Sequence, residues 1–120
     1  MSEIDALRAL LAAKPRPVGW EARRARIEEV AAVDPPPGDV AFAPVEIGGV
    51  PAEWSRSPGA DPDRALLFLH GGGYCSGSIV SHRSLAAGIG RAAGLRVLAL
   101  GYRRAPEHPF PAALEDVLAA

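Results

Sequence analysis

The chain of 120 residues contains one cysteine and one lysine, and it has no long apolar run. With Cys75 alone, no disulfide can form within the chain, which mildly favours a reducing compartment. No stretch reaches the roughly 18 apolar residues that a membrane-spanning helix needs. Glu3 and Asp5 stand where a secretory signal would carry positive charge. We therefore expect a cytoplasmic protein with no membrane partner.

Neither sign of charge is in excess. There are 13 basic and 14 acidic residues, and the net charge is -1. Proteins that bind nucleic acid usually carry a clear basic excess, so nucleic acid is not an expected partner. Glycine and proline are plentiful, with 13 and 12 residues, and they divide the chain into short segments.

Apolar periodicity between these breaks predicts two helices, then a hairpin, then strands that alternate with helices. The expected helices are 2–14, 20–33, 81–93 and a last one from about 111 to 118; the expected strands are 40–47, 50–55, 65–69 and 95–100. Gly48 and Gly49 fit a two-residue hairpin turn. Strands joined through a helix imply a right-handed parallel crossover, so the predicted fold class is α/β.

Two details of this prediction concern how the elements pack. The continuous apolar run 65–69 is typical of a central strand that is covered on both faces. In the helix 81–93, Ser81 is the expected N-cap. Helical spacing would turn its apolar face toward the sheet, and this face comprises Leu85, Ile89 and Ala92.

The apolar run 65–69 ends abruptly in His70-Gly71-Gly72-Gly73. Consecutive glycines lose backbone entropy on folding and contribute no packing, so their presence at a strand end needs a reason. One reason is a backbone that approaches a ligand closely, with N–H groups that stabilise a developing negative charge. The alternative is a plain glycine turn. A dinucleotide-binding loop is disfavoured because the last glycine of G-x-G-x-x-G is missing.

This strand and loop resemble the HGGG motif of α/β-hydrolases, in which the loop donates an N–H to the oxyanion hole. The segment 101–116, GYRRAPEHPFPAALED, closely resembles a second motif of the hormone-sensitive-lipase-like carboxylesterases, bacterial family IV of the α/β-hydrolase fold-3 group. The resemblance implies a helical cap segment with a proline-rich linker at 1–38 and an incomplete hydrolase core at 39–120. Gly101 and Arg104 depart from the family, which usually has Asp and an apolar residue there.

The resemblance also implies roles for the loop. Gly72 and Gly73 would donate the oxyanion-hole N–H groups, while His70 and Gly71 would support the loop. Tyr74 would either contact substrate or pack beside the loop.

Other polar residues near these motifs are expected to be structural. Cys75 is expected to pack and His82 to lie at the surface. His108 would support the cap and core, and Arg103 with Glu107 would form an ion pair.

No serine of the chain stands in the G-x-S-x-G nucleophile elbow that this fold uses. The implied function is hydrolysis of short-chain acyl esters or small lactones by a longer enzyme, of which this chain would be the N-terminal portion. The chain alone would be inactive, with no nucleophile, acid or base. The alternative is a non-catalytic binding module or vestigial relative of an esterase. No metal or other cofactor is implied, the partner is a small ester, and self-association through an exposed sheet edge is expected.

Overall fold

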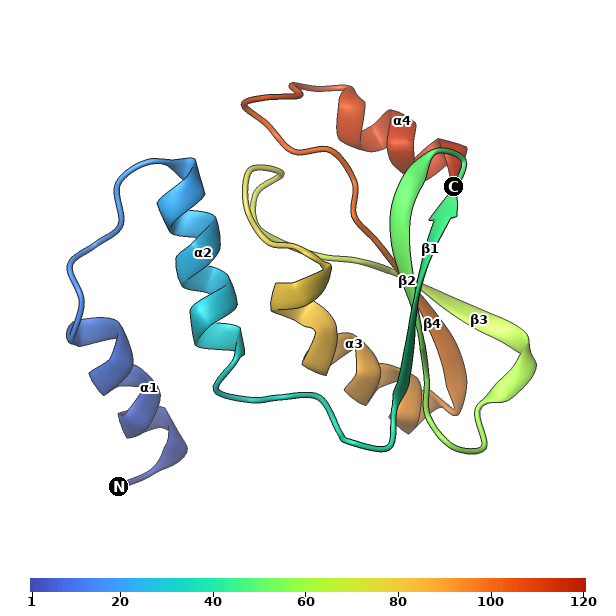
Figure 1. The fold of residues 1–120 in the computed structure, drawn as a ribbon, viewed down its shortest axis with the longest axis horizontal. Coiled ribbons are helices and arrows are strands. Elements are labelled where there is room, and N and C mark those ends of the chain that lie inside the picture. Colours follow the sequence, from blue (N-terminus) through green and yellow to red (C-terminus); the bar gives the residue numbers. More distant parts are fainter.

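A mixed sheet of four strands forms the centre of the molecule, with strand order β1-β2-β4-β3 (Figure 1). The computed structural model describes all 120 residues. The elements in chain order are α1 (Glu3–Ala12), α2 (Trp20–Ala31), β1 (Ala41–Ile47), β2 (Val50–Arg56), β3 (Asp61–Leu69), α3 (Ile79–Ala93), β4 (Leu95–Leu100) and α4 (Ala112–Ala119). Every helix and strand expected from the sequence is present, and the α/β class is confirmed.

The hairpin and the parallel crossover both form as predicted. Gly48 and Gly49 have φ values of 59° and 79°, which is the left-handed conformation that a two-residue turn of this kind requires. β1 pairs antiparallel with β2, and β2 pairs antiparallel with β4. β3 and β4, which α3 connects, pair in parallel.

β4 is the most buried strand, because helices cover both of its faces. Successive side chains of a strand point to opposite faces of the sheet. Val97 contacts α3 on one face. Leu98 and Leu100, with Ala52 of β2, form the core cluster on the other face, where Val117 of α4 packs against them.

β3 differs from the prediction of a strand that is covered on both faces. It lies at the edge of the sheet and begins at Asp61, with an irregular register before Ala65. Leu67 is 50% exposed and Leu69 is 45% exposed. The reason is that α4 covers the β1, β2 and β4 part of its face, and no strand pairs with the outer edge of β3.

α3 also differs from the prediction, at its start and in its buried face. Ser78 is the N-cap, and Ser81 completes a capping box with it. The residues buried against the sheet are Ala86, Ala87 and Gly90, whereas Leu85 and Ile89 are exposed. Small residues occupy the buried face because the helix lies very close to β4. A Cβ on Gly90 would lie 2.5 Å from Cγ2 of Val97.

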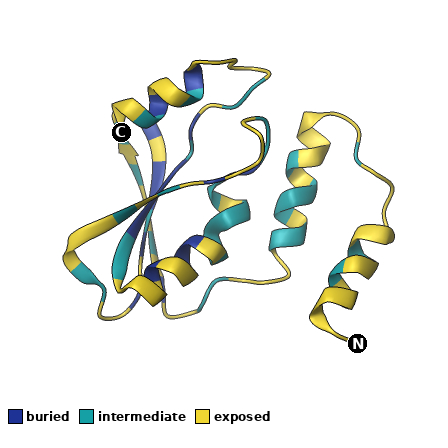
Figure 2. Cartoon of the chain, turned by 180° about the vertical axis from the view of Figure 1, so that it is seen from behind, coloured by how far each residue is buried: buried dark blue, intermediate teal, exposed yellow.

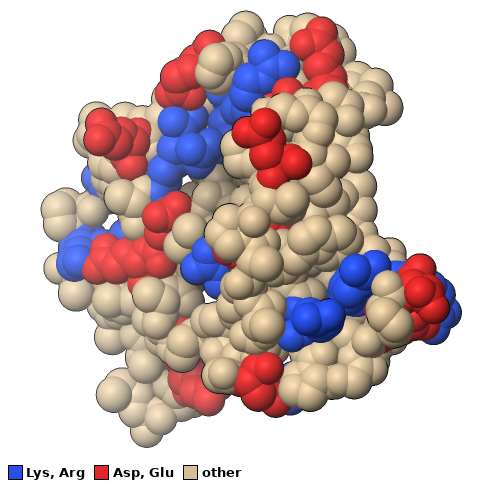
Figure 3. All heavy atoms as spheres, turned by 45° about the vertical axis from the view of Figure 1, so that its right-hand side comes forward, with Lys and Arg blue, Asp and Glu red and all other residues tan.

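α1 and α2 lie to one side of α3, away from the sheet, and neither buries a residue (Figures 1 and 2). Ser2 caps α1 in a capping box with Asp5, as the sequence indicates. On the face seen in Figure 3, acidic and basic side chains are interspersed in small groups, without a broad patch of one sign. None of the four helices is long and apolar enough to cross a membrane.

Candidate active site

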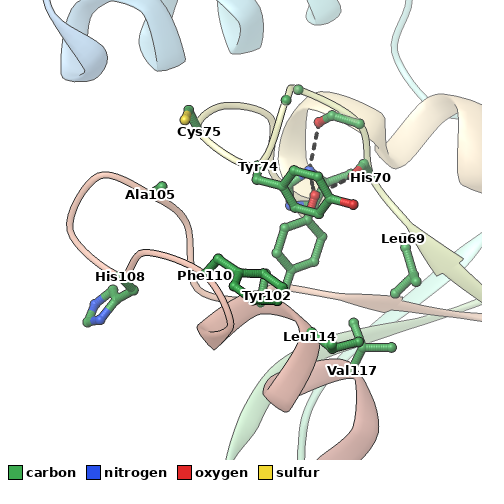
Figure 4. Close-up of a pocket in the computed structure, with 14 residues that line it drawn as sticks. Leu69, His70, Tyr74, Cys75, Tyr102, Ala105, His108, Phe110, Leu114 and Val117 are labelled. Atoms are coloured by element: carbon green, nitrogen blue, oxygen red, sulfur yellow. Dashed lines mark hydrogen bonds between the residues drawn. The ribbon is translucent and has the colours of Figure 1, made fainter.

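A pocket of about 660 Å³ opens at the carboxyl ends of β3 and β4 (Figure 4). The loop 70–78 forms one wall, and the segment 101–111 with α4 forms the other. The lining residues are Leu69, His70, Gly71, Gly72, Gly73, Tyr74, Cys75, Tyr102, Ala105, His108, Phe110, Ala113, Leu114 and Val117. The predicted loop residues His70 to Tyr74 thus all line one cavity. α/β proteins usually bind ligands at the carboxyl ends of their parallel strands, and β3 and β4 are the parallel pair of this sheet.

Gly72 adopts a conformation that no other residue could take without strain. Its φ is 129°, and a Cβ there would lie 2.1 Å from the carbonyl oxygen of Ser76. That close approach exists because the Gly72 carbonyl accepts hydrogen bonds from Ser76 N at 3.0 Å, from Ser76 Oγ at 2.8 Å and from Cys75 N at 3.2 Å. The glycine therefore closes a tight turn over residues 72–76.

The N–H groups of Gly72 and Gly73 donate no hydrogen bond within the chain. In a trans peptide the C=O and the following N–H point in opposite directions. The Gly71 carbonyl is held by His70 Nδ1 at 2.9 Å, and the Gly72 carbonyl is held by Ser76. With both carbonyls turned toward the protein, the N–H groups of the same peptides point the other way. Two adjacent amides are therefore free to bind an acceptor at the pocket wall.

His70 is buried and supports the loop through its ring and its carbonyl. Its ring stacks on Tyr102 with centroids 4.3 Å apart. The Tyr102 hydroxyl donates to the His70 carbonyl at 2.5 Å. Because a carbonyl only accepts, Nδ1 carries the hydrogen in its contact with Gly71. Burial lowers the pKa of His70 below its ordinary value of 6.5, so the neutral ring is favoured.

Tyr74 has a positive φ of 62° and is 70% exposed, and its side chain lines the pocket. Cys75 also lines the pocket and is half-buried. His108 is exposed and lies across the pocket from His70 (Figure 4). The prediction that His82 lies at the surface is wrong. His82 belongs to α3 and is half-buried, with its ring centroid 5.7 Å from that of His70.

The predicted ion pair between Arg103 and Glu107 does not form. Arg103 pairs with Asp116 of α4, which accepts from Arg103 Nε at 2.9 Å and from its backbone N at 2.7 Å. Glu107 instead pairs with Arg24 of α2, at 2.8 and 3.0 Å. The prediction failed because it considered only partners close in the sequence, whereas the fold brings Arg24 to Glu107 from 83 residues away.

Gly101 and Arg104, which depart from the esterase motif, each form a specific hydrogen bond. Gly101 donates from N to the Pro51 carbonyl at 2.7 Å, and a Cβ there would lie 3.2 Å from the same oxygen. A larger side chain would therefore require a small local shift. Arg104 donates to the Gly77 carbonyl at 2.6 Å, so it ties down the end of the glycine loop.

Sequence reasoning missed the residues that hold the loop in place. These are Ser76 within the loop, and Arg24, Tyr102 and Arg104 outside it. Ser76 and Arg104 follow or belong to recognisable motifs, so their proximity to the loop was in principle detectable. Arg24 lies on a helix whose charged residues look like an ordinary solvated face, and only the three-dimensional structure reveals its contacts.

No group of three or more His, Cys, Asp and Glu side chains in the chain is arranged to hold a metal ion.

Comparisons with known proteins agree with this fold. Residues 66–120 match a family described as alpha/beta hydrolase fold. An acetyl-hydrolase of Streptomyces hygroscopicus is 56% identical over 85 residues, which are 71% of this chain and 27% of that protein. An ethyl acetate hydrolase of Pseudomonas putida is 46% identical over 74 residues, which are 59% of this chain and 23% of that protein.

Solved structures extend the likeness over the whole chain. An esterase from the bacterial hormone-sensitive lipase family superposes with a TM-score of 0.88 at 42% identity, and covers 100% of this chain and 42% of its own. An esterase/lipase from an uncultured bacterium superposes with a TM-score of 0.85 at 44% identity, with the same coverage.

The structure is thus that of the N-terminal part of an α/β-hydrolase fold. The chain belongs to the hormone-sensitive-lipase-like family, the bacterial family IV esterases. It spans less than half of the length of the relatives described here. The division at residue 38 and the roles of the loop residues stay predictions.

Proposed function

We propose that this chain forms the oxyanion-hole loop and part of the substrate pocket of a carboxylic ester hydrolase. The observation that carries the proposal is the pair of unpaired N–H groups at Gly72 and Gly73, on the wall of a largely apolar pocket. Attack on an ester carbonyl turns its oxygen into an oxyanion, which needs donors at a fixed position. Removal of one such donor in an enzyme typically costs about 3 kcal/mol of transition-state stabilisation.

The substrates in this proposal are short-chain acyl esters or small lactones. Support comes from the relatives, whose names include an acetyl-hydrolase and an ethyl acetate hydrolase. In the longer enzyme, a serine on a nucleophile elbow would attack the carbonyl, and a histidine oriented by an acidic residue would transfer the proton. These three groups have no counterpart in the chain, which contains no G-x-S-x-G sequence. We assign His70 a structural role, because its ring stacks on Tyr102 and its Nδ1 donates to the Gly71 carbonyl.

The test is hydrolysis of p-nitrophenyl butyrate by two proteins: the 120-residue chain, and the longest polypeptide that the gene encodes when its DNA is read past codon 120. We expect background rates from the chain. We expect turnover from a longer product with G-x-S-x-G, and a loss of about 100-fold or more in kcat when its elbow serine is replaced by alanine.

Two outcomes would overturn the proposal. One is a reading frame that stops at codon 120, because the site would then have no nucleophile and a non-catalytic role would follow. The other is a longer product that carries the elbow and still leaves p-nitrophenyl acetate and butyrate intact.

A further inference from the structure

α2 is attached to the rest of the molecule through polar contacts near the oxyanion loop. It has no buried residue, and its apolar residues show no marked one-sided distribution. Arg24 and Glu28 are four residues apart and therefore lie on the same face of the helix. Glu28 accepts from the Ser78 hydroxyl at 2.7 Å, and Arg24 donates to the Cys75 carbonyl at 2.7 Å. One helix face thus contacts both ends of the segment 75–78.

Arg24 makes the most extensive of these contacts. Besides Cys75, its guanidinium donates to the Ala105 carbonyl at 2.9 Å and to both carboxylate oxygens of Glu107. The loop and the segment 104–107 also contact each other directly, because Ala105 N donates to the Tyr74 carbonyl at 2.9 Å. A planar guanidinium with donors in a fixed fork suits such a three-way junction, whereas a lysine could not reproduce it.

From this junction we infer that Arg24 is a positioning residue for the oxyanion loop, which it fixes by joining Cys75 to Ala105 and Glu107. The effect of Arg24 on catalysis rests on the proposed function. Whether Arg24 fixes the loop can be tested independently of that function. A displacement of about 1 Å in a reacting group can lower a rate by about 100-fold, so a contact outside the pocket can matter for turnover.

The carboxylate partner keeps this junction intact over a wide pH range. The hydrogen bond from Arg24 lowers the pKa of Glu107 from 4.5 to about 2. Glu107 therefore stays ionised, and the ion pair stays formed, until the pH falls to about 2. The positive charge of Arg104 makes a smaller contribution to the same lowering of the Glu107 pKa.

The experiment compares Arg24→Gln with Arg23→Gln by hydrogen–deuterium exchange and mass spectrometry on the 120-residue chain. Arg23 is the matched control, because it is the neighbouring arginine of the same helix and its guanidinium only lies over the Trp20 ring, at 5.1 Å. We expect Arg24→Gln to raise exchange about tenfold in peptides covering 72–78 and 103–108, with peptides of β4 unchanged. Arg23→Gln should leave all of these peptides unchanged.

Two further variants separate this role from general stabilisation. Glu107→Gln keeps the bonds from Arg24 to Cys75 and Ala105, so we expect a smaller increase in exchange than for Arg24→Gln. Arg24→Lys should restore protection only in part, because an ammonium group cannot bridge all three partners. Equal exchange in Arg24→Gln and wild type would overturn the inference, and so would an increase that extends equally through β4.

The effect on catalysis is measured as ester turnover by the longest polypeptide that the gene encodes. We expect Arg24→Gln to lower kcat by at least about tenfold with KM within about twofold, since the loop acts on the transition state. Unchanged kcat in an active enzyme would refute the positioning role even if exchange increases. Absence of activity in the wild type would count against the proposed function alone, and the exchange experiment would still decide whether Arg24 fixes the loop.

Discussion

Tyr102 and His70 form a stacked pair beneath the oxyanion loop. Their rings lie at an interplanar angle of 12°, and the Tyr102 hydroxyl donates to the backbone carbonyl of His70. Both residues are buried. The pair thus connects the end of β4 to the start of the loop that follows β3, and it holds the imidazole in the orientation that binds the Gly71 carbonyl.

The Tyr102 hydroxyl should therefore contribute to stability. Tyr102→Phe keeps the stacked ring but leaves the His70 carbonyl without its donor, and we expect a loss of about 1 to 2 kcal/mol in the free energy of unfolding. Urea denaturation measures it. Tyr74→Phe removes a hydroxyl from an exposed ring of the same pocket and should change the free energy little. Equal stability of the two variants would show that the hydroxyl contact contributes nothing.

Gly71 and Gly72 should differ sharply in their tolerance to alanine. Gly72→Ala places a Cβ against the Ser76 carbonyl at a strained φ, so we expect a destabilisation of at least about 2 kcal/mol. Gly71→Ala introduces a Cβ into open space without a positive φ, and we expect a change within about 0.5 kcal/mol. Thermal unfolding of both variants gives the comparison, which a large effect at Gly71 or none at Gly72 would contradict.

Asp116 should make stability depend on acid pH. The hydrogen bond from Arg103 lowers its pKa below the ordinary value of 3.8. The contact therefore stabilises the fold fully above about pH 4, and this stabilisation is lost as the pH falls below 4 and through the pKa of the folded state. We expect Asp116→Asn to lower the free energy of unfolding by about 1 kcal/mol at pH 7, with a smaller difference at pH 3.

Glu115→Gln is the matched control for Asp116→Asn. Glu115 is the neighbouring carboxylate on α4, and it approaches Arg103 only to 3.5 Å from an exposed position. Its replacement should leave stability almost unchanged at both pH values. A difference between wild type and Asp116→Asn that stays constant from pH 7 to pH 3 would contradict the proposed titration.

The features that the sequence predicted correctly are those with local causes. The Gly48-Gly49 turn depends on two adjacent residues, so the sequence pattern contains all of the necessary information. The glycine loop that follows β3 belongs to the same group, because at a φ of 129° any residue other than glycine would be strained. Its predicted role stays a prediction. The cap of α3 was misplaced from Ser78 to Ser81 because two serines three residues apart can exchange these roles.

Features set by distant parts of the chain were not predictable in this way. The burial of Leu67 depends on which elements lie beside β3. Arg24 and Glu107 form their ion pair only in the folded chain. In α3, helical periodicity favoured Leu85 as a buried residue. Close packing on β4 instead selected Ala86 and Gly90, because only small side chains fit there. Strand neighbours, ion-pair partners and the distance between α3 and β4 determine these features. None of them can be inferred from the spacing of residues in the sequence.

The outer edge of β3 should make the 120-residue chain self-associate. It carries unpaired backbone groups next to the exposed Leu67 and Leu69, a combination that favours edge-to-edge pairing with a second copy. A lysine at such an edge opposes pairing, so we expect Leu67→Lys to shift the chain toward monomer in a concentration series by size-exclusion chromatography with light scattering. Leu118→Lys is the control, since Leu118 is more exposed but lies on α4. A wild-type chain that stays monomeric throughout, or an equal effect of the two variants, would exclude association through this edge.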